Sequence, residues 1–231
     1  MPVLYHHAAS PTCRAIRITL REFKVEPELV EERPWERREA FLLLNPAGDI
    51  PVLQDDDDTI VVGVHAITEY CDEVYGQQGE AQQRLLPEAK KDRAEVRRLL
   101  HWAHNKLHHD VTFHLVGEKI YKRQMPPSLG GGSPDTNALR AARSNIKWHM
   151  QYLGHLLSTR NWLGGDEFSL ADLAIAAHLS IADFLAEVPW QEDQATREWY
   201  ARMKSRPSFR TLLQDRIRGI QPPAYYINPD F

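Results

Sequence analysis

The sequence predicts two domains, a small α/β domain over residues 1–76 and an all-helical domain over residues 90–219. In the first third of the chain, short apolar runs alternate with helical patterns in the order β-α-β-α-β-β-α, which is typical of an α/β domain. Residues 77–89 have the polar composition of a linker, and beyond them the pattern is helical. A chain of 231 residues is long enough to give both domains a core.

The overall composition is ordinary for a globular protein, with 42% apolar and 26% charged residues. A net charge of −4 does not predict binding to nucleic acid or to a membrane surface. No apolar run reaches membrane-spanning length, and the N-terminus lacks the regions of a signal peptide. The only cysteines, Cys13 and Cys71, fit a reducing compartment. We therefore expect a cytoplasmic protein whose partners are neither nucleic acids nor membranes.

The first domain opens with an apolar run at residues 3–6 that suits a buried strand. Ser10 and Pro11 then predict a helix start, because serine caps free N–H groups and proline fits the first helical position. That helix has one apolar face, formed by Cys13, Ile16, Leu20 and Phe23. Further strands are expected over 28–32, 50–53 and 59–62, and further helices over 41–44 and 65–74. Four consecutive aspartates at residues 55–58 predict a solvated hairpin turn.

The second domain is predicted to contain five helical stretches, over 90–124, 137–160, 169–185, 191–205 and 208–218. Gly219 suits the C-terminal cap of the last helix. The tail that follows, residues 220–231, holds three prolines and three aromatic residues. Its proline content predicts an extended segment without a helix.

Five segments carry the motifs of one family in the family's order: residues 10–14, 45–51, 66–70, 163–166 and 169–172. The first, Ser-Pro-Thr-Cys-Arg, resembles the entry to that family's first helix. The last, Ser-Leu-Ala-Asp, is similar to its helix-capping signature. On these motifs the chain is identified as a member of the glutathione transferase superfamily. The resemblance implies the cytosolic fold of that family, a thioredoxin-like N-terminal domain followed by an all-α domain, and a homodimer through the long helical pair.

The resemblance also locates the glutathione site. It implies that Pro51 follows a cis peptide bond and that the backbone of Ile50 faces the cysteinyl part of glutathione. It places Gly63 and Val64 where the family has a Glu-Ser pair for the γ-glutamyl end. Gly63 has no side chain and that of Val64 is apolar, so neither can pair with the charged γ-glutamyl end. Each such lost interaction costs roughly 1–3 kcal/mol of binding free energy. We therefore expect a degenerate glutathione site and no cofactor.

Ser10 occupies the position from which the family activates the glutathione sulfur. The residues themselves leave two interpretations open, a catalytic hydroxyl or a helix cap, and the cap is favoured because Pro11 follows directly. Cys13 lies on the apolar helix face and is expected in the core. A catalytic role for Ser10 belongs only to the alternative in which the protein is a transferase.

Several features indicate a surface that docks another protein. Trp35 stands in a strongly charged segment, so it is either an exposed anchor or packed across the domain boundary. The tail offers further aromatic and acidic contacts for a partner, at Tyr225, Tyr226, Pro229, Asp230 and Phe231. Four basic residues also form a stripe along the first helix, expected to be solvated or to meet an acidic partner: Arg14, Arg17, Arg21 and Lys24.

The first long helix carries His101, His104 and His108 at spacings of three and four residues. Such spacing aligns imidazoles, but acidic or cysteine ligands in register are missing. We therefore predict no metal site, and instead a solvated or dimer-facing side of the helix.

Together the lost Glu-Ser pair, Trp35 and the tail resemble the FtsZ-binding members of the superfamily. That resemblance implies a non-enzymatic dimer that binds FtsZ filaments at the bacterial division site and regulates their bundling and curvature through its tail. The alternative function is a glutathione transferase that conjugates glutathione to a small electrophile.

Overall fold

The computed structural model describes residues 1–77 and 84–228, and it confirms the predicted order of elements in the first domain. The strands are β1 (Val3–His6), β2 (Glu28–Glu31), β3 (Val52–Gln54) and β4 (Ile60–Val62), and the helices are α1 (Pro11–Glu22), α2 (Glu39–Leu44) and α3 (Val64–Val74). The sheet order is β2-β1-β3-β4, in which β2 is parallel to β1 while β3 and β4 are antiparallel to their neighbours. The four aspartates form the predicted turn between β3 and β4, with Asp58 at a left-handed φ of 64°.

The second domain begins with a helical segment that runs without interruption from Lys90 to Gln124. It comprises α4 (Lys90–His101), α5 (Phe113–Val116) and α6 (Lys122–Gln124), joined by π-helical turns over Trp102–Thr112 and Gly117–Tyr121. The remaining helices are α7 (Thr136–Leu157), α8 (Leu170–Phe184), α9 (Gln194–Lys204) and α10 (Arg210–Leu213). None of the described helices is both long and apolar enough to cross a membrane.

Helix α8 forms the centre of this domain, since every residue of it is buried. Its N-terminus has the predicted cap: the Asp172 carboxylate accepts the N–H of Ser169 at 3.0 Å and that of Leu163 at 3.0 Å. The Trp199 indole donates to the same carboxylate at 2.9 Å, so one buried acid fixes three segments. Burial raises the pKa of Asp172, and the three donors oppose that change.

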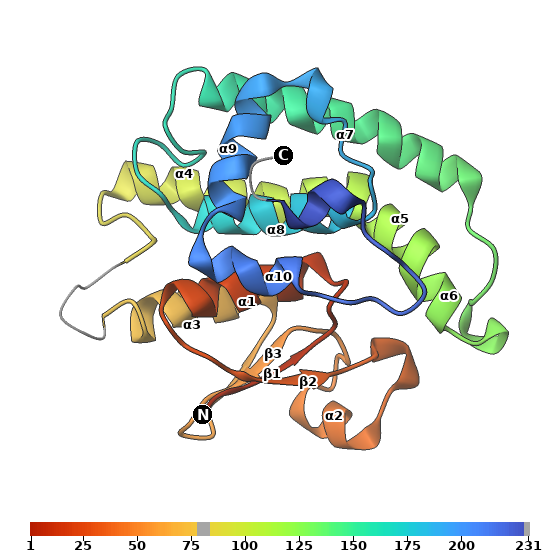
Figure 1. The fold of residues 1–231 in the computed structure, drawn as a ribbon. Helices are drawn as coiled ribbons and strands as arrows, with labels where there is room; N and C mark the ends of the chain where they lie inside the picture. Colours follow the sequence, from red (N-terminus) through yellow and green to blue (C-terminus); the bar gives the residue numbers. More distant parts are fainter. Residues whose placement is uncertain (78–83, 229–231) are drawn as a thin grey trace.

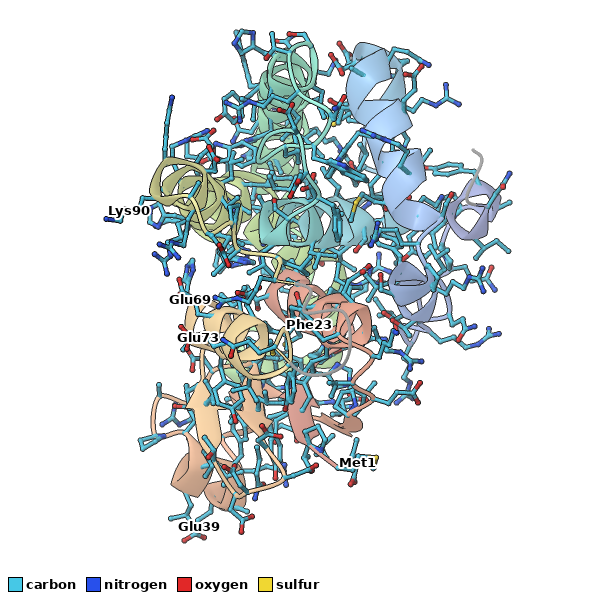
Figure 2. The ribbon with its side chains drawn as sticks, turned by 90° about the vertical axis from the view of Figure 1, so that its left-hand side faces the viewer. Met1, Phe23, Glu39, Glu69, Glu73 and Lys90 are labelled. Atoms are coloured by element: carbon cyan, nitrogen blue, oxygen red, sulfur yellow. The ribbon has the colours of Figure 1, made fainter. Side chains whose placement is uncertain are left out.

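Helix α1 lies between the sheet and α8 (Figure 1), and this position decides what its side chains contact. Ile16 and Leu20 belong to the core on the sheet side, while Ala15 and Ile18 belong to the core shared with the helical domain. Phe23, just after α1, packs against both cores, and Figure 2 shows it where the two domains meet. A helix covered on opposite faces has little surface left for solvent.

Polar contacts also join the two domains. Glu22 at the end of α1 accepts hydrogen bonds from Nε and Nη2 of Arg206, at 2.7 and 2.8 Å. Glu69 on α3 accepts two donors of Arg97 on α4, again at 2.7 and 2.8 Å. Figure 2 shows Glu69 on the side of α3 that faces the helical domain. Bidentate pairs of this kind restrict how the domains are oriented.

The structure corrects two predictions near the C-terminus. The last helix was expected over 208–218, but α10 ends at Leu213, and Gly219 lies at a φ of 79° in a turn between Ile217 and Ile220. The tail was expected to be extended, yet it contains a 3₁₀ turn over Ala224–Ile227. The turn forms because Tyr226 is drawn into the core, where its side chain is fully buried.

Candidate functional site at the domain boundary

The glutathione position keeps its backbone geometry. The Ile50–Pro51 peptide bond is cis, as the resemblance implies, and Gly63 donates its N–H to the Pro51 carbonyl at 3.1 Å. Gly63 has a φ of 86° immediately before α3, and Val64 packs against the apolar core of the first domain. Neither residue supplies a polar side chain for a charged ligand group.

Ser10 is engaged as a helix cap. Its Oγ accepts the N–H of Cys13 at 3.3 Å and lies 2.9 Å from the Thr12 hydroxyl, and only 5% of the residue is exposed. Cys13 is fully buried, and burial raises the pKa of its thiol to about 11, so the thiolate is not formed near neutral pH. The cap interpretation of Ser10 and the core placement of Cys13 are both confirmed.

Trp35 packs across the domain boundary. It lies in the 3₁₀ turn Pro34–Glu36 after β2 and is half-buried. Its ring centroid is 5.2 Å from that of Tyr121 in the helical domain and 5.8 Å from that of His7. Part of the indole surface remains exposed, so the residue combines both interpretations made from the sequence.

His7 links this aromatic group to the end of α6. The backbone N–H of Ala9 donates to His7 Nδ1 at 3.1 Å, so this ring nitrogen carries no proton. The proton of the neutral ring is therefore on Nε2, which donates to the Gln124 Oε1 at 3.0 Å. Burial lowers the pKa of His7, which keeps the ring neutral at physiological pH.

A crevice of about 660 Å³ opens beside His7, between the two domains. Its lining is rich in arginine and includes residues from both domains: His7, Ala8, Glu31, Arg33, Arg123, Gln124, Arg216, Ile217, Arg218 and Gly219. Two of the lining residues connect the crevice to the predicted partner segments. Arg33 is two residues before Trp35 in the chain, and Gly219 directly precedes the tail. None of the residues predicted for the glutathione site lines it.

The tail begins at the crevice, and its described part, up to residue 228, packs on the helical domain. Tyr226 is fully buried; its hydroxyl donates to the Leu212 carbonyl at 3.0 Å and accepts Arg14 Nη1 at 3.2 Å. Tyr225 and Ile227, on either side, are 37% and 63% exposed. Tyr226 is thus an anchor for the tail, and its predicted role as a partner contact is wrong because no surface of it is accessible. Pro229, Asp230 and Phe231 lie outside the described residues.

The expected solvated stripe on α1 is also wrong at two of its positions. Arg14 is fully buried and Arg17 is 6% exposed, because α1 lies between the sheet and the helical domain. Both guanidinium groups bind Asp215, Arg14 at 3.0 Å and Arg17 through two donors at 2.8 Å. These arginines neutralise an internal acid and are not available to a partner.

With this geometry established, comparison with known proteins gives the family. Models of the glutathione S-transferase N-terminal and C-terminal domains match residues 9–74 and 126–207. FtsZ-localized protein A of Caulobacter vibrioides is 39% identical over 231 residues, covering 99% of this chain and 97% of that protein. The chain belongs to the glutathione transferase superfamily.

Two solved structures extend the comparison. A glutathione S-transferase from Sinorhizobium meliloti 1021 is 49% identical with a TM-score of 0.96, and FzlA from C. crescentus is 38% identical with a TM-score of 0.92. These matches cover all of this chain, 100% of the first structure and 99% of the second.

The long first helix of this transferase fold leaves His101 exposed, as expected, but not His104. His104 is only 8% exposed, and its Nδ1 lies 3.1 Å from His178 Nε2 on α8. His178 Nδ1 in turn lies 3.1 Å from the Thr112 hydroxyl, which lies 2.9 Å from His108 Nδ1. The group is an internal hydrogen-bonded chain. Among residues 1–77 and 84–228, no three His, Cys, Asp or Glu side chains are placed to hold a metal ion.

The crevice arginines are the residues that sequence reasoning missed. Arg123, Arg216 and Arg218 were assigned to helices or to a helix end, with no role. No local pattern marks them, because their common feature is a shared cavity and not a spacing along the chain.

Proposed function

We propose that this protein binds FtsZ filaments as a homodimer and regulates their bundling and curvature at the bacterial division site. The observation that carries the proposal is the 39% identity, over nearly the whole chain, to a protein named FtsZ-localized protein A. The degenerate site adds support, because Gly63 and Val64 offer nothing to the charged end of glutathione.

The proposed contact surface combines Trp35 with the end of the tail, Pro229, Asp230 and Phe231. The structure supports dividing the tail into two parts with different tasks. Tyr226 fixes the segment to the core, and the residues after it carry the partner-specific groups. A twofold dimer would present this surface twice, so that one dimer could bridge two filaments.

The proposal is tested by removing only residues 229–231. This truncation keeps the Tyr226 anchor and its contacts with Arg14 and Leu212, so the fold is preserved. We expect the truncated protein to lose co-sedimentation with FtsZ polymer while its unfolding midpoint and its sedimentation velocity stay unchanged. Arg140→Ala, at an exposed position of α7, is the control that should co-sediment like the parent. Full co-sedimentation of the truncated protein would remove the tail from the proposal.

The second candidate function, a glutathione transferase, is favoured by the 49% identity to the Sinorhizobium structure of that name. In that case Ser10 activates the sulfur, and backbone groups or the dimer partner replace the Glu-Ser pair. Calorimetric titration with glutathione, run beside the pelleting assay, separates the two functions. Micromolar binding together with thiol transfer that is lost in Ser10→Ala would establish the enzyme.

A further inference from the structure

The crevice concentrates positive charge in a protein whose net charge is negative. The chain carries −4 overall, yet the crevice is lined by four arginines and one acid. Arg33 is paired with Glu31 at 3.1 Å and with Glu36 at 3.3 Å. For the other three, Arg123, Arg216 and Arg218, the described part of the chain supplies no carboxylate partner within salt-bridge distance. Within the described residues, three guanidinium groups without a carboxylate partner thus line one cavity.

Gln124, which also lines the crevice, adds hydrogen-bond donors to those of the arginines. Because the Gln124 Oε1 accepts a hydrogen bond from His7 Nε2, the orientation of the side-chain amide is fixed. Its nitrogen carries two hydrogens, and no acceptor for them is found among residues 1–77 and 84–228. His7 is itself held by the Ala9 N–H and by its contacts with Trp35 and Tyr121. The neutral imidazole therefore occupies the acceptor of Gln124 and leaves the amide donors of this lining residue available to a ligand.

We propose that this crevice is a binding site for a small polyanion, a molecule that carries at least two phosphate or carboxylate groups. Arginine guanidinium groups match the oxygens of both anions through paired hydrogen bonds. A volume of about 660 Å³ lies in the range of small-molecule sites and encloses a ligand more closely than an open surface would. Three unpaired charges exceed what a single carboxylate neutralises, so the ligand has several acidic groups.

This inference goes beyond binding to FtsZ and does not depend on it. The ligand would contact Arg33 in the first domain as well as Arg123, Arg216 and Arg218 in the second. Since Arg33 is close to Trp35 in sequence and Arg218 precedes the tail, the ligand would also join the two proposed partner segments. A ligand that binds only this arrangement stabilises it, and the stabilisation grows with the logarithm of the ligand concentration above the dissociation constant.

Isothermal titration calorimetry with sodium pyrophosphate and with sodium citrate tests the proposal on the complete protein. We expect saturable binding of at least one probe with a dissociation constant below about 1 mM. The affinity should fall as the salt concentration rises from about 50 to about 300 mM, because salt screens exposed charges. The two probes separate a phosphate ligand from a carboxylate ligand. An absence of saturable heat with both would overturn the proposal, and binding of an acidic hexapeptide alone would reassign the crevice to a protein partner.

Two variants locate the binding. The double variant Arg216→Ala/Arg218→Ala changes two exposed side chains and should weaken binding by about 10-fold or more. Gln124→Glu keeps an acceptor for His7 but replaces the amide donor with a negative charge, so it should weaken binding at least as much. Arg140→Ala removes another exposed charge, outside the crevice, and should leave the affinity unchanged. If the control weakened binding as much as the crevice variants, the interaction would be a general charge effect and the site would be refuted.

Discussion

Two groups of arginines in this protein show how different the same side chain can be. The α1 pair, Arg14 and Arg17, is buried and shares the Asp215 carboxylate. The crevice group, Arg123, Arg216 and Arg218, is exposed and lines an open cavity. Asp215 and Arg216 are adjacent in the chain, so one loop serves both regions. The first region uses charge to hold the fold together, and the second leaves charge available for a ligand.

The difference lies in what covers each guanidinium group. Arg14 donates to the Ala8 carbonyl at 2.8 Å, to the Ser180 hydroxyl at 2.7 Å and to the Tyr226 hydroxyl at 3.2 Å, in addition to Asp215. A buried charge is tolerated when its hydrogen-bonding groups are satisfied in this way. The crevice arginines remain hydrated and require no such partners. The structural arginines therefore differ from the proposed ligand-binding ones in their exposure to solvent and in the number of their hydrogen-bond partners.

The largest expected effect breaks the buried side of this comparison. Asp215→Ala leaves Arg14 and Arg17 in the interior without their carboxylate, and removal of one partner from a buried ion pair costs about 3–5 kcal/mol. We expect a loss of this size in the free energy of unfolding, measured by urea denaturation monitored by circular dichroism. Arg218→Ala, three residues along the chain, is the matched control and should change stability by less than about 0.5 kcal/mol. Equal, small effects of both substitutions would show that the two groups of arginines do not differ energetically.

The same contrast explains which features the sequence could predict. The Ser10 cap and the aspartate turn depend on neighbours within a few residues, and both were predicted correctly. The burial of Arg14 depends on Ser180, Asp215 and Tyr226, which lie 166 to 212 residues away. Helical spacing placed the arginines on one side of α1 but carried no information about the element that covers that side.

The tail and the crevice were hard to predict for a related reason. Proline content correctly excludes a long helix from the described part of the tail, residues 220–228, but it does not exclude a single 3₁₀ turn held by one aromatic side chain. The crevice is formed where four separate segments meet, so it has no sequence motif of its own. The family motifs predicted the backbone of the glutathione site well, because that backbone is what they encode.

A second buried charge below the tail gives the next largest effect. Asp183 is fully buried on α8, and burial raises the pKa of its carboxyl to about 6, opposed by the Trp190 indole, by Lys204 and Tyr200, and by Arg14. Between about pH 4 and pH 6 the native state therefore binds a proton that the unfolded state releases. The stability that this group contributes is complete below about pH 4 and is lost as the pH rises through 6.

The variant Asp183→Asn removes this titration. We expect the stability of the parent relative to the variant to fall by roughly 2–3 kcal/mol between pH 4 and pH 7, since each pKa unit is worth about 1.4 kcal/mol. Urea unfolding of both proteins at four pH values across this range measures the change. A difference that stays constant, or that grows with pH, would show that the carboxyl is ionised in the native state throughout.

The smallest effect concerns the anchor that joins the tail to the buried arginine. Tyr226→Phe keeps the ring, which packs edge-on against Phe184 at 5.2 Å, and removes only the hydroxyl. The buried Leu212 carbonyl then loses a donor and Arg14 loses an acceptor, at a cost of about 1–2 kcal/mol. Tyr225→Phe, at the partly exposed neighbouring position, is the control and should cost clearly less in the same unfolding measurement. If the two substitutions cost the same, the tail would be held by its apolar contacts alone, and Arg14 would stabilise the interior through Asp215 without fixing the tail.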